Sequence, residues 1–154
     1  MPLTLAGHLS LIADELAAAR AAALSRRKAL LVATLLDNFA DRAFAARRGD
    51  PEAVFGAEDL PAYREALRRR APSLGLVFDL GAQRPDGPRL EVVDVEVPIA
   101  EYHLLSVEDY MVSLYNRNTV QRVVIAGPGD ARVLAHPALA EALAFWQAAG
   151  LPHD

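Results

Sequence analysis

The longest stretch without a helix-breaking residue dominates this sequence. Residues 9–48 contain no glycine or proline, and 13 of these 40 residues are alanine, the residue that favours helix most. A straight helix of this length would measure ~60 Å, whereas a compact domain of this size has a radius of gyration of ~15 Å. A polar cluster at residues 25–28 interrupts the apolar stripe. The sequence therefore predicts a long helix that either breaks near 25–28 or packs against a second subunit.

The composition narrows the class of protein. At 154 residues the chain fits a single domain, residues 1–154, and the absence of cysteine excludes disulfides and thiolate metal sites. The net charge is −4, whereas nucleic-acid binding calls for a basic face. No apolar run approaches the ~20 residues that span a bilayer. We expect no secretory signal, because no basic segment followed by an apolar one begins the sequence. We expect a soluble, cytoplasmic protein with no nucleic-acid or membrane partner. Its arginine-rich, lysine-poor composition is typical of a bacterium with a GC-rich genome.

Shorter helix and strand signals follow the long helix. Asp59 and Pro61 predict the start of a helix over 60–70. Apolar residues alternate on both sides of a Pro-Asp-Gly turn, which predicts an antiparallel hairpin over 74–98. The other predicted elements are a helix over 106–116, strands over 119–134 and a helix over 137–149. The order predicts an α+β fold: a long N-terminal helix packed on a mainly antiparallel sheet of two hairpin-like strand pairs, with a C-terminal helix.

The predicted hairpin carries the first candidate site. If its turn centres on residues 86–87, Asp79 lies opposite Asp94, and Glu96 shares their face. Three such carboxylates could bind Mg²⁺ and activate water for phosphodiester cleavage. The element order resembles the restriction-endonuclease-like core, although Glu96 stands where that fold usually has lysine. The interpretation we favour is a solvated outer face of a sheet. The four histidines are far apart in the sequence, so we predict no metal site and no cofactor.

The second candidate site lies between the predicted hairpin and the next strand. A capping pattern at Ser106 predicts a helix that buries Val107, Tyr110, Met111 and Leu114. The flanking residues combine aromatic area with hydrogen-bonding groups, as recognition surfaces do. The candidate binding residues are Tyr102, His103, Tyr115, Asn116, Arg117 and Asn118. The interpretation we favour is that Tyr110 belongs to the core and that residues 115–118 are a helix end followed by a turn.

Two functions are compatible with these patterns. The first is a small homo-oligomeric binding or protein-interaction module, which forms a homodimer through its N-terminal helix. The second is a metal-dependent hydrolase, similar to a phosphodiesterase or nuclease, that uses Asp79, Asp94 and Glu96. We favour the first, non-enzymatic function, because the sequence contains no strong catalytic motif.

Overall fold

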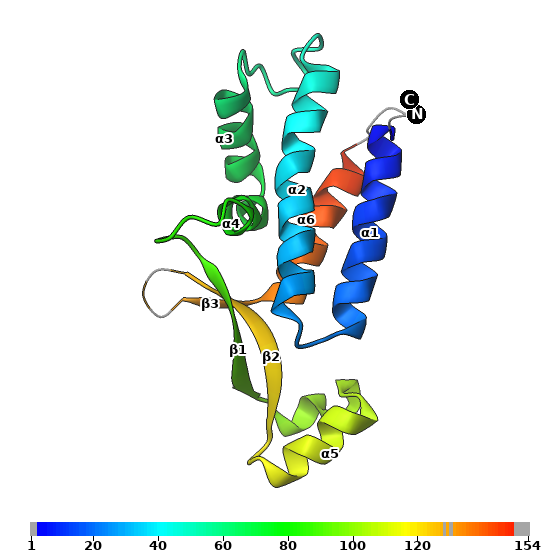
Figure 1. The fold of residues 1–154 in the computed structure, drawn as a ribbon, viewed down its shortest axis with the longest axis vertical. Helices are drawn as coiled ribbons and strands as arrows, with labels where there is room; N and C mark the ends of the chain where they lie inside the picture. The colour runs from blue at the N-terminus through cyan, green and yellow to red at the C-terminus, as the bar shows by residue number, and fades with distance from the viewer. Residues whose placement is uncertain (1–2, 128, 130, 150–154) are drawn as a thin grey trace.

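The computed structural model describes residues 3–127, 129 and 131–149, and its architecture is α+β. In this part of the chain, six α-helices and a 3-10 helix accompany one antiparallel sheet of three strands. The elements are α1 (Leu5–Ala21), α2 (Arg26–Arg47), α3 (Leu60–Arg70), α4 (Pro72–Gly81), β1 (Arg89–Glu96), η1 (Ile99–Leu104), α5 (Val107–Tyr115), β2 (Thr119–Ala126), β3 (Arg132–Leu134) and α6 (Ala135–Ala148). Figure 1 shows α1–α4 and α6 gathered at one end of the molecule, which we call the helical bundle, and α5 at the other. No described helix combines the length and the apolar character needed to cross a bilayer.

The predicted helix over 9–48 is two helices that fold back on each other. α1 ends at Ala21, and α2 begins after Ser25, whose Oγ accepts the N–H of Lys28 at 3.1 Å. The break therefore lies at residues 22–25, next to the predicted position. Because the chain folds back here, α1 buries its apolar face against α2 and α6 (Figure 1). The length of the run is accommodated within a single chain.

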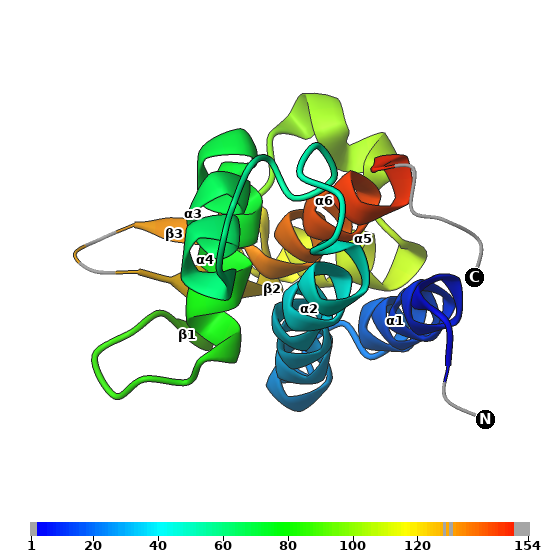
Figure 2. The same ribbon diagram turned by 90° about the horizontal axis from the view of Figure 1, so that it is seen from above.

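α2 is the central helix of the bundle. Figure 2 shows α1 on one side of α2 and α4 on the other, and α6 contacts all three. Phe39 of α2 and Trp146 of α6 pack edge to face with ring centres 5.0 Å apart. α4 approaches α2 closely at Gly81, where a Cβ atom would lie 2.9 Å from the carbonyl oxygen of Ala33. The N-terminal helices thus pack mainly with α4 and α6, and not on the face of the sheet as the sequence predicted.

The prediction of a strand in the first half of the hairpin is wrong. Residues 72–81 form α4, which begins at Pro72, and Phe78 is 1% exposed inside the bundle. Residues on nearly every side of α4 are buried among α2, α3 and α6. When a short segment is buried all round, alternation of apolar residues does not distinguish a strand from a helix. Gly75 and Gly81 each weaken the intrinsic helix propensity by ~1 kcal/mol, and burial outweighs this cost.

The second half of the predicted hairpin is a strand, but its partner is β2. The antiparallel register places Glu96 opposite Thr119 and Val95 opposite Val120. Phe78 and Val95 therefore do not face each other. β3 pairs antiparallel on the other side of β2, as expected for two strands within 119–134. The sheet is one three-stranded meander rather than two separate hairpins.

The sheet meets the bundle at one end only. Leu90, Val123 and Ile125 belong to the same apolar core as the bundle helices. At the far end of the sheet, residues 97–118 connect β1 to β2. This long connection, and not the tight turn predicted at 86–87, joins the paired strands.

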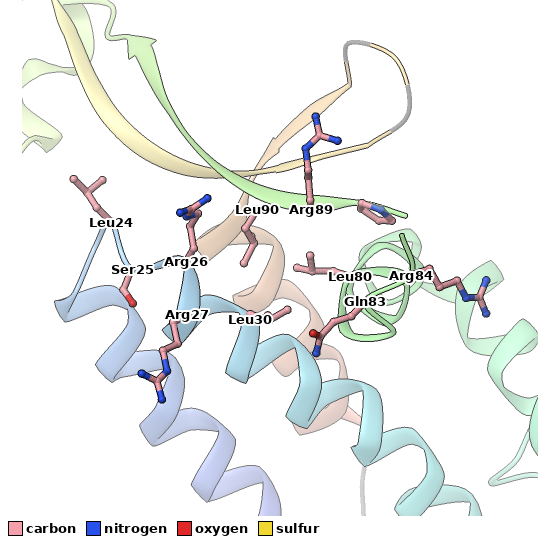
Figure 3. Close-up of a pocket in the computed structure, with 11 residues that line it drawn as sticks. Leu24, Ser25, Arg26, Arg27, Leu30, Leu80, Gln83, Arg84, Arg89 and Leu90 are labelled. Atoms are coloured by element: carbon pink, nitrogen blue, oxygen red, sulfur yellow. The ribbon is translucent and has the colours of Figure 1, made fainter. Parts of the chain in front are cut away.

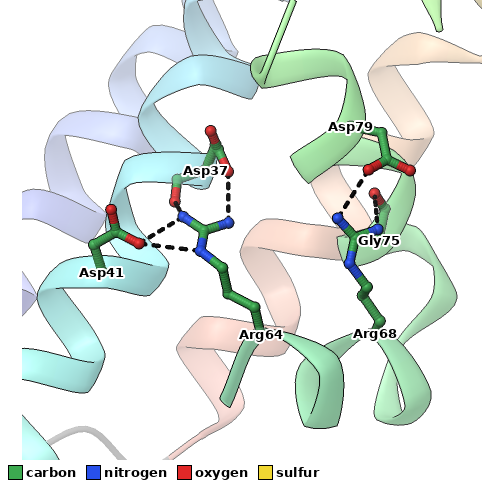
Figure 4. Close-up of polar contacts among 6 residues, drawn as sticks. All are labelled: Asp37, Asp41, Arg64, Arg68, Gly75 and Asp79. Atoms are coloured by element: carbon green, nitrogen blue, oxygen red, sulfur yellow. Dashed lines mark hydrogen bonds and ion pairs between the residues drawn. The ribbon is translucent and has the colours of Figure 1, made fainter. Parts of the chain in front are cut away.

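Ion pairs tie α3 to the helices beside it. Arg64 donates hydrogen bonds to Asp37 at 2.7 Å and to Asp41 at 2.6 Å, both on α2 (Figure 4). Arg68 donates to Asp79 on α4 at 2.8 Å (Figure 4). Asp79 thus connects α4 to α3 within the bundle and does not lie on a strand.

Candidate interaction surface

The connection between β1 and β2 forms a distinct arm of the molecule. We call residues 97–118 the arm, and they contain η1 and α5. The N–H of Val97 donates to the carbonyl oxygen of Asn118 at 2.8 Å, which closes the base of the arm. Figure 1 shows the arm at the end of the sheet opposite to the helical bundle, and α5 packs on β2.

The side of α5 that faces the sheet is polar. Ser113 is fully buried, and its hydroxyl group donates to the carbonyl oxygen of Tyr110 at 2.7 Å. Asp109 accepts a hydrogen bond from Arg122 of β2 at 3.0 Å. Ser106 accepts the N–H of Asp109 at 3.1 Å and caps the helix, as predicted. The buried side chain on this side of α5 is thus a serine, and the ion pair between Asp109 and Arg122 connects the helix to β2.

The apolar side of α5 faces solvent. Residues at positions i, i+3, i+4, i+7 and i+8 share one face of a helix, and in α5 all five are apolar or aromatic. They are Val107 (80% exposed), Tyr110 (41%), Met111 (49%), Leu114 (53%) and Tyr115 (83%), and we call them the apolar stripe. Leu104 of η1 is 72% exposed in the same arm. The prediction that this helix buries Val107, Tyr110, Met111 and Leu114 is therefore wrong, because α5 turns its polar side to the sheet.

The N-terminal members of the predicted binding set lie on η1. The hydroxyl group of Tyr102 donates to Oδ1 of Asn118, and its ring packs edge-on against Tyr110 with ring centres 5.9 Å apart. Tyr102 is half-buried, whereas His103 is exposed. Tyr102 and Asn118 thus link η1 to the residue that ends the arm.

The other predicted binding residues surround the C-terminal end of α5. An open pocket of about 440 Å³ is lined by Asp94, Tyr115, Asn116, Arg117 and Thr119. Arg117 and Asn118 have φ values of 54° and 63°, so the chain reverses here through two left-handed residues. The structure therefore has the predicted turn, and this turn brings Tyr115 and Arg117 to the surface beside β1.

The three carboxylates of the first candidate site do not converge. Asp79 lies on α4 and pairs with Arg68, whereas Asp94 and Glu96 are exposed on β1. The predicted pairing of Asp79 with Asp94 fails because residues 72–81 are helical, and Asp94 lies opposite Gln121 instead. Among the described residues, no group of three or more aspartate, glutamate or histidine side chains could hold a metal ion.

A second hollow, of about 650 Å³, lies where the α1–α2 turn meets the α4–β1 loop. Leu30, Leu80 and Leu90 face one another inside it (Figure 3). Its margin includes the arginines at positions 26, 27, 84 and 89. Figure 3 shows the guanidinium groups of Arg27, Arg84 and Arg89 extending in different directions. The margin is cationic, but its charges do not converge on one point, as the charges of an anion-binding site do.

Comparisons of this chain with protein-family models, with curated proteins and with solved structures find no match. The most unusual feature of this chain is the exposed apolar stripe of α5.

Proposed function

We propose that the protein is a homo-oligomeric protein-interaction module, and that the apolar stripe of its arm is the contact surface between two copies. The observation that carries this proposal is the orientation of α5: its polar side contacts β2, and its apolar side is exposed. Exposed apolar area costs about 25 cal/mol per Å² relative to burial. Packing one stripe against another would remove much of this cost.

The size of the exposed surface supports a protein partner. At the exposed fractions given above, the stripe and Leu104 present on the order of 500 Å² of side-chain surface to solvent. The largest apolar patch on a typical monomer covers ~300–600 Å² and is often functional. A standard interface takes ~800 Å² from each partner. The arm therefore offers enough apolar area for the centre of such an interface.

The charge of the arm favours a protein partner over a membrane or a nucleic acid. α5 carries Glu108 and Asp109 and has no lysine or arginine, and the whole chain has a net charge of −4. Helices that lie on membranes usually have a basic polar face, and nucleic acids attract basic surfaces. A second copy brings an identical apolar stripe, and a two-fold interface requires a self-complementary patch of this kind.

The N-terminal helices offer a second surface for the proposed homodimer. Leu11 is 38% exposed, and Leu24 and Leu31 are each 44% exposed. Single exposed apolar residues are ordinary on monomeric proteins. The turn at residues 22–25 also removes the conflict between the length of the helical run and the size of the domain. We therefore place the primary interface at the arm and test the two surfaces against each other.

Light scattering over a concentration series separates these surfaces. The unaltered protein should exceed its monomer mass of 16.6 kDa at roughly tens of micromolar, a concentration that matches a modest interface. The double variant Met111→Ser with Leu114→Ser should stay monomeric with an unchanged circular dichroism spectrum. The matched variant Leu31→Ser on α2 should associate as the unaltered protein does.

Two results would contradict this proposal in different ways. If Leu31→Ser dissociates the oligomer and the double variant does not, the interface lies on the N-terminal helices. If the unaltered protein is monomeric at every concentration, the protein is not a homo-oligomeric module.

A further inference from the structure

We infer that the two copies pair through antiparallel α5 helices, related by a two-fold axis that passes near Met111, so that Glu108 of one copy lies beside the partner's Arg117. This inference rests on the proposed function, because it concerns the same apolar stripe. It adds the orientation of the two helices and the charged groups that select this orientation.

The sizes of the stripe residues favour the antiparallel arrangement. Met111 is the middle residue of the stripe, with Val107 four residues before it and Tyr115 four residues after it. In an antiparallel pair, the small Val107 side chain meets the partner's large Tyr115, and the two-fold axis makes this contact occur twice. In a parallel pair, the two valines would meet at one end and the two tyrosines at the other. Close packing favours large side chains opposite small ones.

The charges at the two ends of α5 favour the same arrangement. Glu108 is exposed in the first turn, and Arg117 is exposed just beyond the last turn. Neither side chain forms an ion pair within the described part of the chain. An antiparallel pair places these opposite charges next to each other twice, whereas a parallel pair places like charges together. Antiparallel helix dipoles also attract each other, because each N-terminus lies near a C-terminus.

Two other carboxylates lie near these charges. Asp94 lines the same pocket as Arg117, on the side of β1. Asp109 is held by Arg122 on the opposite side of α5, away from the apolar stripe. Glu108 is therefore the carboxylate of α5 that remains available to a second copy.

Disulfide cross-linking tests the orientation directly, since the chain contains no cysteine. We expect a mixture of Val107→Cys and Tyr115→Cys proteins, one of them carrying a size tag, to form a heterodimeric disulfide on mild oxidation. Each of these variants alone should cross-link far less. Met111→Cys alone should cross-link with itself, because its position lies near the two-fold axis. Asn38→Cys, exposed on α2, mixed with Tyr115→Cys measures cross-linking by random collision.

Charge reversal provides a second measurement that does not depend on cysteine. Glu108→Arg should raise the dissociation constant about ten-fold, because two attractive contacts become repulsive. Adding Arg117→Glu to the same chain should restore most of the affinity. A parallel pair predicts no restoration, because like charges would still meet at both ends.

The possible failures are distinguishable. Self-cross-linking of Val107→Cys and of Tyr115→Cys, each alone, would overturn the antiparallel inference and leave the arm as the interface. An oligomer that persists in light scattering without any cross-link at α5 would overturn the inference and move the interface elsewhere. A protein that stays monomeric at every concentration would overturn both the inference and the proposed function.

Discussion

Two short helices of this molecule, α4 and α5, are rich in apolar residues and have opposite environments. α4 buries six of its residues among three other helices, and its single charged side chain pairs with Arg68. α5 buries only Ser113, and its five apolar or aromatic stripe residues are exposed. Apolar content therefore does not determine whether a helix joins the core. What matters is which face the neighbouring element engages, and an apolar face that no neighbour engages is available to a second chain.

The largest expected difference between the two helices is the effect of removing an aromatic ring. Phe78→Ala should lower the free energy of unfolding by ~3–5 kcal/mol, because it leaves a cavity inside the bundle. Tyr115→Ala on α5 should change it by no more than ~0.5 kcal/mol, because the ring is already exposed. Urea titration at low protein concentration measures both. Equal losses would show that α5 belongs to the same core as α4.

A smaller effect is expected from adding one methyl group to α4. Gly81→Ala should lower the free energy of unfolding by ~1–3 kcal/mol, because its Cβ would lie 2.8 Å from the Cβ of Asp37. Gly49→Ala is the matched control, since nothing lies within 4 Å of a Cβ at that position. If both substitutions proved equally mild, the close approach of α4 and α2 would be incorrect.

The attachment of α5 to β2 should be weaker than the packing of α4, and it should respond to one charge. Asp109→Asn removes the ion pair with Arg122. The side chain of Arg122 is 29% exposed and that of Asp109 is 35% exposed. We expect faster amide hydrogen exchange in α5, by roughly five-fold, which corresponds to ~1 kcal/mol of local stability. Exchange in the bundle helices should not change. Uniform acceleration in both regions would mean that the arm and the bundle unfold together.

The smallest expected effect is a pH dependence of the free energy of unfolding, which arises from a histidine in the bundle. Burial lowers the pKa of His136 at the start of α6, and the charges of Arg20 and Arg122 lower it further. The native state therefore binds fewer protons at this histidine than the unfolded state, whose histidines titrate near ~6.5. The native state therefore keeps its full stability while His136 is neutral, above about pH 6.5, and loses stability as the pH falls below that value.

Urea titrations at several pH values check this expectation. His136→Gln should reduce the loss of stability on acidification, because glutamine does not titrate. Burial and Arg42 also lower the pKa of His8, so His8→Gln should act in the same direction. A pH profile that neither substitution alters would assign the acid sensitivity to other groups.

Local signals in the sequence predicted much of the helical structure. The caps at Asp59 and Ser106 place the starts of α3 and α5 correctly, because capping is a property of a few neighbouring residues. The sequence Gly-Pro-Gly-Asp at residues 127–130 is typical of a turn; β2 ends at Ala126 and β3 begins at Arg132, while residues 128 and 130 lie outside the described structure. Strands within 119–134 and the C-terminal helix are confirmed, with α6 beginning two residues before its predicted start at 137.

The sequence did not predict features that depend on contacts between elements far apart in the chain. The residues of α4 satisfy the strand pattern and the buried-helix pattern equally well, and only its packing among α2, α3 and α6 decides between them. The spacing of the apolar stripe in α5 is visible in the sequence, but its direction is not. That direction depends on Arg122, a residue of β2 that anchors Asp109. The sequence therefore marks this segment as a candidate site but predicts its exposed apolar residues to be buried.

The position of the arm has a consequence for the shape of any assembly. β1 and β2 are eight residues each, or ~25 Å long, and they separate the arm from the bundle (Figure 1). Two copies joined at their arms would form a dumbbell with a bundle at each end. A compact protein of twice this length has a radius of gyration of ~19 Å, and small-angle scattering from the dumbbell should exceed that value. Every surface of the bundle would then be presented twice at a fixed spacing, which makes such a particle bivalent towards whatever contacts it.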